Sequence, residues 1–266
     1  MPLCPKYLKI FADTAVTLLL WTYFTLGFVI FFAPFYVAAV IFAADRRLAF
    51  QKLNHRFLKG FLWLLRKAVP GLTLEIDKRI QGLESCVVVS NHRSYLDPVI
   101  MIACFARQST IVKKDFFHIP IFGRVLQAAG YIPSERKGRL ASLLMERIEY
   151  MRTYLAEGGV LFVFPEGTRS RTGRIGEFNK GVFKIARNAN APIEVLCITN
   201  TDRLFPPGRF LFNTCVRNRI QVRWVGRLSP EDTGGMPIEH VMAEVREIME
   251  SHQDASADEP PENADC

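Results

Sequence analysis

The sequence predicts an α/β fold: a largely parallel central sheet flanked by helices and preceded by a membrane segment. Three observations lead to this fold class. Short apolar runs typical of buried strands alternate with helical patterns from residue 70 onward. Polar, glycine-containing segments follow several of these runs, as expected of loops at the edge of a sheet. A long uncharged stretch precedes the whole α/β region.

The uncharged stretch runs from Thr14 to Ala44 without an Asp, Glu, Lys, Arg or His. As one helix it would be about 46 Å long, whereas the hydrocarbon core of a bilayer is about 30 Å thick. Pro34 predicts a kink or break. Basic residues flank both ends, which favours a hairpin with two cytoplasmic ends and leaves a single anchor open.

The segment 56–68 mixes aromatic and basic residues. That composition suits a helix in the lipid interface and equally a core helix beneath the domain. Residues 1–69 are therefore interpreted as the N-terminal membrane anchor and interfacial helix. We expect deletion of residues 1–45 to weaken lipid association more than it damages the α/β fold.

Residues 70–250 form the predicted catalytic domain. Its strands are expected at 72–76, 86–90, 110–112, 160–164, 193–199 and 220–225, and its helices at 98–106, 138–157, 180–188 and 238–250. The remaining residues, 251–266, are acidic and contain proline, which predicts a disordered tail.

Charge and cysteine content narrow the function classes. The net charge of +8 includes the five acidic residues of the tail, so residues 1–250 carry +13. A net positive charge this large predicts a polyanionic partner, such as nucleic acid, an anionic lipid surface or a phosphorylated substrate. The six cysteines form no C-x-x-C pair, which predicts free thiols in a reducing compartment and no zinc site.

The first candidate motif is N-H-R-S-Y-L-D-P, residues 91–98, directly after a predicted strand. His92 and Asp97 converge only if the chain turns between them, and we expect Asp97 just before a helix that begins at Pro98. A carboxylate on Nδ1–H would leave Nε2 to accept a hydroxyl proton. From the spacing alone, a helix-capping Asp97 and an ordinary loop histidine remain an alternative.

The second candidate motif is F-P-E-G-T-R-S-R, residues 164–171, again directly after an apolar strand. Gly167 permits close approach of the backbone, Thr168 offers a hydroxyl, and Arg169 offers a planar fork for a phosphate. Open α/β sheets bind ligands at the carboxyl ends of their strands. The loop therefore predicts a phosphate-binding site.

Together, the two motifs resemble those of the glycerolipid acyltransferase superfamily, typified by 1-acylglycerol-3-phosphate O-acyltransferases. The similarity covers residues 50–230 and includes the segments 113–123, 130–136 and 191–193. The resemblance implies that His92 is the general base and Asp97 orients it. It also implies that the acceptor and its phosphate are held by Arg136, Glu166, Gly167, Thr168 and Arg169, with help from Lys113.

The resemblance implies a membrane enzyme of phospholipid biosynthesis. The acyl group would pass from acyl-CoA or acyl carrier protein to 1-acyl-sn-glycerol-3-phosphate, giving phosphatidic acid, with no acyl-enzyme, cofactor or metal. The catalytic domain would face the cytoplasm, for example at a bacterial inner membrane. Its partners would be membrane lipids, the lysophospholipid and the acyl donor, with no nucleic acid.

Two departures from the family pattern keep other acceptors open. Glu135 stands where the family usually has Asp, and Glu194 follows Ile193 in a segment that usually carries a second proline. A related lysolipid such as lyso-ornithine lipid is the alternative acceptor. An alternative from another class is a membrane-tethered polyanion-binding protein. No G-x-S-x-G elbow surrounds Ser94, so a structural or substrate-binding serine is expected there.

Overall fold

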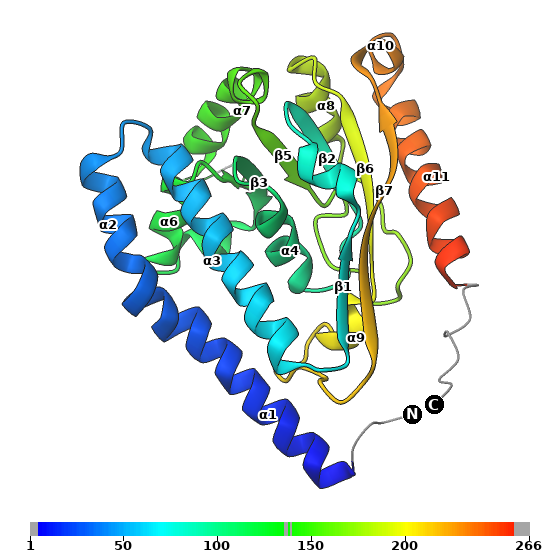
Figure 1. The fold of residues 1–266 in the computed structure, drawn as a ribbon. Coiled ribbons are helices and arrows are strands. Elements are labelled where there is room, and N and C mark those ends of the chain that lie inside the picture. The colour runs from blue at the N-terminus through cyan, green and yellow to red at the C-terminus, as the bar shows by residue number, and fades with distance from the viewer. Residues whose placement is uncertain (1–4, 136–137, 139, 258–266) are drawn as a thin grey trace.

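The computed structural model describes residues 5–135, 138 and 140–257. Its centre is a sheet whose strands are ordered β1-β7-β6-β2-β5-β3-β4 (Figure 1). The strands are β1 Leu72–Ile76, β2 Cys86–Ser90, β3 Gln108–Val112, β4 Ile132–Pro133, β5 Val160–Val163, β6 Ile193–Thr199 and β7 Asn218–Leu228.

Strand directions place the loops that carry the motifs at one edge. Neighbouring strands pair in parallel except β6 and β7, which are antiparallel, so the predicted largely parallel sheet is confirmed. The carboxyl ends of β2, β3, β4, β5 and β6 therefore lie along the same edge of the sheet. All residues of β2, β5 and β6 are buried, as expected of parallel strands covered on both faces.

The helices form a layer on each face of the sheet. One face packs against α3 and α4, and the other against α7, α8 and α11. The helices after the N-terminal segment are α3 Arg46–Ala68, α4 Leu96–Cys104, α5 Lys114–Phe117, α6 Phe122–Ala128, α7 Ala141–Ala156, α8 Lys180–Asn188, α9 Thr201–Leu204, α10 Pro230–Thr233 and α11 Ile238–Ala257, with a short 3₁₀ turn η2 at Lys78–Gly82. Helix α11 continues past residue 251, where the tail was expected to begin, and residues 258–266 lie outside the described part.

The N-terminal segment is one continuous helix from Lys6 to Phe42. It consists of α1 Lys6–Thr22, a π-helical stretch η1 Tyr23–Phe32 and α2 Ala33–Phe42, and it changes direction along its length (Figure 1). Pro34 lies in the first turn of α2, directly after the π-helical stretch. The widened π-helical turns accommodate the missing proline N–H, so the helix bends and does not break. The hairpin forms between this helix and α3, not within the apolar run as the flanking charges suggested.

The helix is a candidate membrane anchor by length and composition. At about 1.5 Å per residue it spans about 55 Å, more than the hydrocarbon core of about 30 Å. Large apolar side chains are exposed along its outer side, among them Phe11, Leu18, Val29, Phe31, Phe35 and Ile41. A contiguous exposed apolar surface of this kind is typical of contact with lipid.

The inner side of the same helix belongs to the core. Leu20 is only 1% exposed and packs in the cluster that contains Phe57 and Phe61 of α3. The Tyr23 ring stacks on that of Phe57 with centroids 5.1 Å apart. Deletion of residues 1–45 would uncover this cluster, so the structure indicates that the deletion also damages the α/β fold; which of the two effects is larger stays a prediction.

Helix α3 is a core helix. Phe57, Leu58, Phe61, Leu62 and Leu65 are buried in the main hydrophobic cluster, whereas Trp63 points outward and is exposed. Of the two interpretations that composition left open for residues 56–68, the structure favours the core helix. Residues 46–68 are therefore part of the domain's packing as well as of the N-terminal hairpin.

Candidate active site

The candidate catalytic pair lies where the chain leaves β2. Asn91 is buried, and its side-chain amide donates to the Ile198 carbonyl at 2.9 Å and accepts from the Ile198 N–H at 2.7 Å. These bonds tie the end of β2 to β6. The backbone beyond Asn91 then turns out of the sheet and enters α4, which brings residues 92 and 97 onto the same side of the turn.

His92 and Asp97 contact each other directly. His92 Nδ1 lies 2.8 Å from Asp97 Oδ2, and Asp97 is fully buried. The same oxygen accepts the backbone N–H groups of Arg93 at 2.6 Å and Ser94 at 2.7 Å, while Oδ1 accepts the Thr201 hydroxyl at 2.6 Å. Because Asp97 accepts, Nδ1 carries the proton, and Nε2 is left to accept one.

The route to this contact differs from the expected one. Asp97 lies inside the first turn of α4, which begins at Leu96, and not just before a helix that begins at Pro98. Pro98 is tolerated there because the first N–H groups of a helix have no intrahelical partner. The turn that brings His92 to Asp97 is therefore made at residues 91–95.

The loop after β5 holds His92 from the other side. The imidazole stacks on the Phe164 ring with centroids 4.3 Å apart. The His92 N–H donates to Glu166 Oε1 at 3.0 Å, and the His92 carbonyl accepts the Ser170 N–H at 2.8 Å. Glu166 Oε2 also accepts the Gly176 N–H at 2.8 Å. Both Glu166 oxygens thus accept backbone N–H groups, and the residue joins the two loops; its role as a ligand of the acceptor stays a prediction.

Arg169 has the features of an anion ligand. Its guanidinium lies over the Tyr95 ring, 3.5 Å from the centroid. Its Nη1 atom is buried and has no hydrogen-bond partner among the described residues. A buried cationic donor without a partner is costly, so this atom is suited to a bound phosphate oxygen. Gly167 (φ +67°) and Thr168 lie exposed on the same loop, two residues and one residue before Arg169.

Of the remaining predicted ligands, one lies at the same edge of the sheet and the other lies outside the residues that the structure describes. Lys113 is exposed at the residue that precedes α5, directly after β3. Arg136 follows β4 and lies outside the described residues. The structure thus brings His92, Asp97, Glu166 and Arg169 into one assembly, with Lys113 on a neighbouring loop.

Two contributors to the assembly were not predicted from the sequence. The Thr201 hydroxyl donates to Asp97, and the Phe164 ring stacks on the His92 imidazole. Phe164 is the first residue of the second motif. An aromatic residue at the end of a strand beside the candidate histidine could therefore have indicated this stacking contact. Thr201 follows β6, and its relevance depends on β6 lying beside β2, which no local pattern in the sequence shows.

Ser94 has a structural role in this arrangement. It is fully buried, its hydroxyl donates to the Phe205 carbonyl at 2.7 Å, and it accepts the Leu96 N–H at 3.2 Å. A hydroxyl with both its donor and acceptor capacity used inside the protein is not available as a nucleophile. The expectation of a structural serine fits these contacts.

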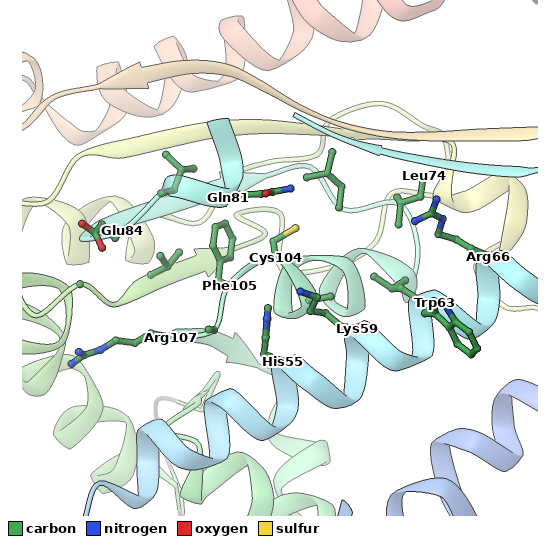
Figure 2. Close-up of a pocket in the computed structure, with 17 residues that line it drawn as sticks. His55, Lys59, Trp63, Arg66, Leu74, Gln81, Glu84, Cys104, Phe105 and Arg107 are labelled. Atoms are coloured by element: carbon green, nitrogen blue, oxygen red, sulfur yellow. The ribbon is translucent and has the colours of Figure 1, made fainter. Parts of the chain in front are cut away.

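A cavity of about 620 Å³ lies away from this assembly. Figure 2 shows it between α3, which contributes His55, Lys59, Trp63 and Arg66, and the segment around Cys104 and Phe105. It is also lined by Glu84, Gly158 and Val160, at the amino ends of β2 and β5. His92 and Asp97 are at the carboxyl end of β2, so the cavity and the candidate site occupy opposite edges of the sheet.

The cysteines that the structure describes are free, as predicted, and Cys86, Cys197 and Cys215 are buried. Burial raises the pKa of the Cys86, Cys104 and Cys197 thiols to about 12, so these thiols are protonated at neutral pH. The thiolate is the reactive form of cysteine. These residues are therefore unsuited to carry the acyl group.

We expect these thiols to resist alkylation in the native protein. A Cys4→Ser/Cys266→Ser variant treated with iodoacetamide at about pH 8 should gain no adduct at Cys86, Cys104 or Cys197, and should gain them after unfolding. Mass spectrometry of the intact protein measures the adducts, and an acyl-transfer assay on the same sample measures function. Rapid native alkylation with parallel loss of activity would contradict the assignment.

Comparison with known proteins identifies the domain. Residues 71–199, which carry both motifs, match the Acyltransferase family model. The chain is 33% identical over 165 residues to a chloroplastic 1-acyl-sn-glycerol-3-phosphate acyltransferase of Brassica napus, a match that covers 59% of this chain and 46% of the relative. It is 29% identical over 166 residues to a 1-acyl-sn-glycerol-3-phosphate acyltransferase of Pseudomonas aeruginosa, covering 60% of each. The chain thus spans less than two thirds of the length of either relative.

The fold is shared with a solved structure. The crystal structure of the 1-acyl-sn-glycerophosphate acyltransferase PlsC from Thermotoga maritima superposes with a TM-score of 0.73 over 96% of this chain and 100% of that chain, at 21% identity. The N-terminal helices are included in this coverage, so the likeness extends beyond the central sheet. Residues 71–199, the segment that carries both motifs, thus form a domain that matches the acyltransferase family.

Proposed function

We propose that the protein transfers a fatty acyl group from the thioester of acyl-CoA or acyl carrier protein to the free hydroxyl of 1-acyl-sn-glycerol-3-phosphate, giving phosphatidic acid. The observation that carries the proposal is the joined pair of loops at the carboxyl edge of the sheet. One loop holds His92 against the buried Asp97, and the other holds Arg169 with an unpartnered Nη1. A base and a phosphate ligand on adjacent loops are what a phosphorylated alcohol acceptor needs.

The chemical step needs no covalent enzyme intermediate. His92 Nε2 takes the proton of the acceptor hydroxyl as that oxygen attacks the thioester carbonyl carbon. The C–S bond then breaks, the acyl group remains on the glycerol oxygen as an ester, and the leaving thiolate takes the proton back from the imidazolium. Asp97 stabilises the imidazolium between these events, because its charge lies 2.8 Å from Nδ1.

The substrates and the candidate anchor suggest where the reaction takes place. The acceptor and product are membrane lipids, and the apolar outer side of the Lys6–Phe42 helix would hold the domain at their surface. Both acyl donors are cytoplasmic molecules, which supports a catalytic domain on the cytoplasmic face, such as that of a bacterial inner membrane. Apart from these co-substrates, the proposed reaction requires no cofactor.

A panel of acceptors and donors tests the proposal. The full-length protein in mixed micelles is assayed for thiol release from acyl-CoA and from acyl carrier protein, with lysophosphatidic acid, lyso-ornithine lipid or lysophosphatidylethanolamine. Thiol release that requires lysophosphatidic acid, with an ester product identified by mass spectrometry, is the expected result. Thiol release only with lyso-ornithine lipid would show that this lipid, and not lysophosphatidic acid, is the acceptor. No thiol release with any acceptor would contradict the enzymatic function.

Replacing Arg169 with Lys is expected to raise the apparent KM for the lysolipid by about tenfold or more, with a smaller effect on the KM for the donor. Lysine keeps the charge but lacks the planar fork with which Arg donates two parallel N–H hydrogen bonds to a phosphate. Steady-state kinetics with each substrate varied in turn measure the two constants. The matched control is Arg171→Lys, an exposed arginine on the same loop. Equal damage to both KM values at Arg169 would argue for a structural role.

A further inference from the structure

The inner side of α1 carries a buried carboxylate, Asp13. Asp13 is 8% exposed, and its Oδ1 accepts both the backbone N–H and the hydroxyl of Thr214, each at 2.7 Å. Its Oδ2 pairs with Lys9 Nζ at 2.5 Å. A buried charge is costly unless it is paired and hydrogen-bonded, so these partners hold Asp13 to one place on the domain.

Two further residues of α1 contact the same short segment. Lys9 Nζ also donates to Asn213 Oδ1 at 2.6 Å, and Thr17 Oγ1 accepts the Phe212 N–H at 3.0 Å. Three residues on successive turns of α1 thus bind three consecutive residues of the segment between α9 and β7. We call this set the α1 clasp: Lys9, Asp13 and Thr17 with Phe212, Asn213 and Thr214.

The clasped segment is connected to α9 and its flanking residue Phe205. The Asn213 N–H donates to the Leu204 carbonyl at 2.8 Å, and the Phe212 ring stacks on Phe205 with centroids 4.3 Å apart and planes 9° from parallel. The Phe205 N–H in turn donates to the Thr201 carbonyl at 2.9 Å. The segment and α9 therefore pack as one unit.

That unit contacts the catalytic pair at two points. Thr201 donates its hydroxyl to Asp97 Oδ1 at 2.6 Å. The Phe205 carbonyl accepts the hydroxyl of Ser94, whose N–H in turn donates to Asp97 Oδ2. Asp13 and Asp97 are thus joined through hydrogen bonds, one ring stack and the short backbone stretches 212–214 and 201–205, although they lie 84 positions apart in the chain.

We propose that Asp13 is a positioning residue for acyl transfer: through the α1 clasp and residues 201–205 it holds Asp97, and with it His92, in the productive geometry. The inference rests on the function proposed above. On this proposal the candidate membrane anchor, through α1, helps to position the residues of the catalytic site. Because the opposite side of α1 is the apolar surface expected to meet lipid, the clasp joins the lipid-facing helix to the catalytic pair.

The test compares full-length Asp13→Ala with Asp13→Asn and with a matched control. Asp13→Ala removes the acceptor of both Thr214 bonds, whereas Asp13→Asn keeps an oxygen for them and should restore most of the activity. Asp45→Ala is the control, because Asp45 also lies in the N-terminal hairpin and caps α3 through the Leu48 N–H at 2.9 Å, outside the clasp. All three are assayed well below their measured unfolding temperatures.

Asp13→Ala is expected to lower kcat by about tenfold or more, since misplacing a reacting group from a distance costs up to about 10²-fold. The KM for lysophosphatidic acid should change less than kcat does. The clasp reaches Asp97 through hydrogen bonds, whereas it reaches Arg169, where the proposed function places the phosphate, only through the contact of Phe205 with the Tyr95 ring. Asp45→Ala should leave kcat unchanged. A wild-type kcat in Asp13→Ala, or the same loss in Asp45→Ala, would overturn the proposal.

Hydrogen exchange separates this proposal from the function on which it rests. In Asp13→Ala, amides in peptides that cover residues 92–97 and 201–205 should exchange faster than in the wild type and in Asp45→Ala. If Asp13→Ala does not fold, Thr214→Val takes its place, since it removes one hydroxyl and keeps the backbone N–H. Unchanged exchange in both peptides contradicts the coupling even if the wild type proves inactive on every lysolipid, an outcome that would remove only the acyltransferase proposal.

Discussion

Replacing His92 with Ala is expected to lower the rate of acyl transfer by about 10²–10⁴-fold, the contribution typical of a general base. The substitution removes Nε2, the atom that accepts the hydroxyl proton. It should leave the fold intact, because His92 is built into the two loops through its backbone N–H and carbonyl, which alanine keeps. Asp97 also retains its bonds to Arg93, Ser94 and Thr201. Initial rates of thiol release with lysophosphatidic acid measure the effect.

The control for this variant is His240→Ala. His240 is exposed on α11, which packs on the far face of the sheet, and its replacement should change neither the rate nor the unfolding temperature. Thermal unfolding of both variants establishes that equal amounts of folded protein are compared. A folded His92→Ala protein with near-normal turnover would remove the general-base mechanism and most of the case for this edge of the sheet as the active site.

The pairing of His92 with Asp97 was predictable because local rules fix its parts. A buried strand before residue 91 and a helix soon after it force a turn, and a turn is the condition under which a five-residue spacing brings two side chains together. The second motif follows another strand, and parallel strands end at a common edge. These steps use only sequence patterns within a few residues of each motif.

The supporting contacts were less predictable because they depend on strand order. Thr201 reaches Asp97 because β6 lies beside β2, and β6 follows β2 in the chain only after three intervening strands. Glu166 was interpreted as a ligand of the acceptor, but two backbone N–H groups from different loops converge on it. A carboxylate in a polar loop has the same sequence signature in either role.

In the N-terminal region, too, contacts with residues distant in the sequence decide what the local sequence pattern leaves open. An amphipathic helix with an aromatic side and a basic side fits a lipid interface and a protein core equally well, and only the partner surface decides between them. For α3 that partner is the sheet together with the N-terminal helix, whose η1 residues Tyr23 and Phe24 cover Phe57 and Phe61. Asp13 directly precedes the uncharged run in the sequence, and its buried position depends on Thr214, 201 residues away in the chain.

Replacing Asp97 with Asn is expected to lower kcat by about 10²–10³-fold. Replacing the aspartate that orients a catalytic histidine with Asn costs about 10⁴-fold in kcat where the imidazole tautomer is lost as well, and a smaller loss is expected here because the tautomer is retained. The amide has a preferred orientation here. The N–H groups of Arg93 and Ser94 both point at the Oδ2 position and require an acceptor, so the amide oxygen should take that place and the NH₂ group should face the Thr201 hydroxyl. The fold and the proton on His92 Nδ1 are then retained, and the loss reports the missing negative charge beside the imidazolium.

Two comparisons distinguish charge from geometry. Thr201→Val removes one hydrogen bond to Asp97 and keeps its charge, so it should cost about tenfold, as expected for one hydrogen bond to a charged group, while Thr201→Ser should stay close to the wild type. The double variant His92→Ala/Asp97→Asn should be little slower than His92→Ala alone, because a carboxylate that acts only through the imidazole has nothing to stabilise once the imidazole is gone. Additive losses in the double variant, with the fold intact by thermal unfolding, would mean that Asp97 contributes to turnover by a route that does not pass through His92.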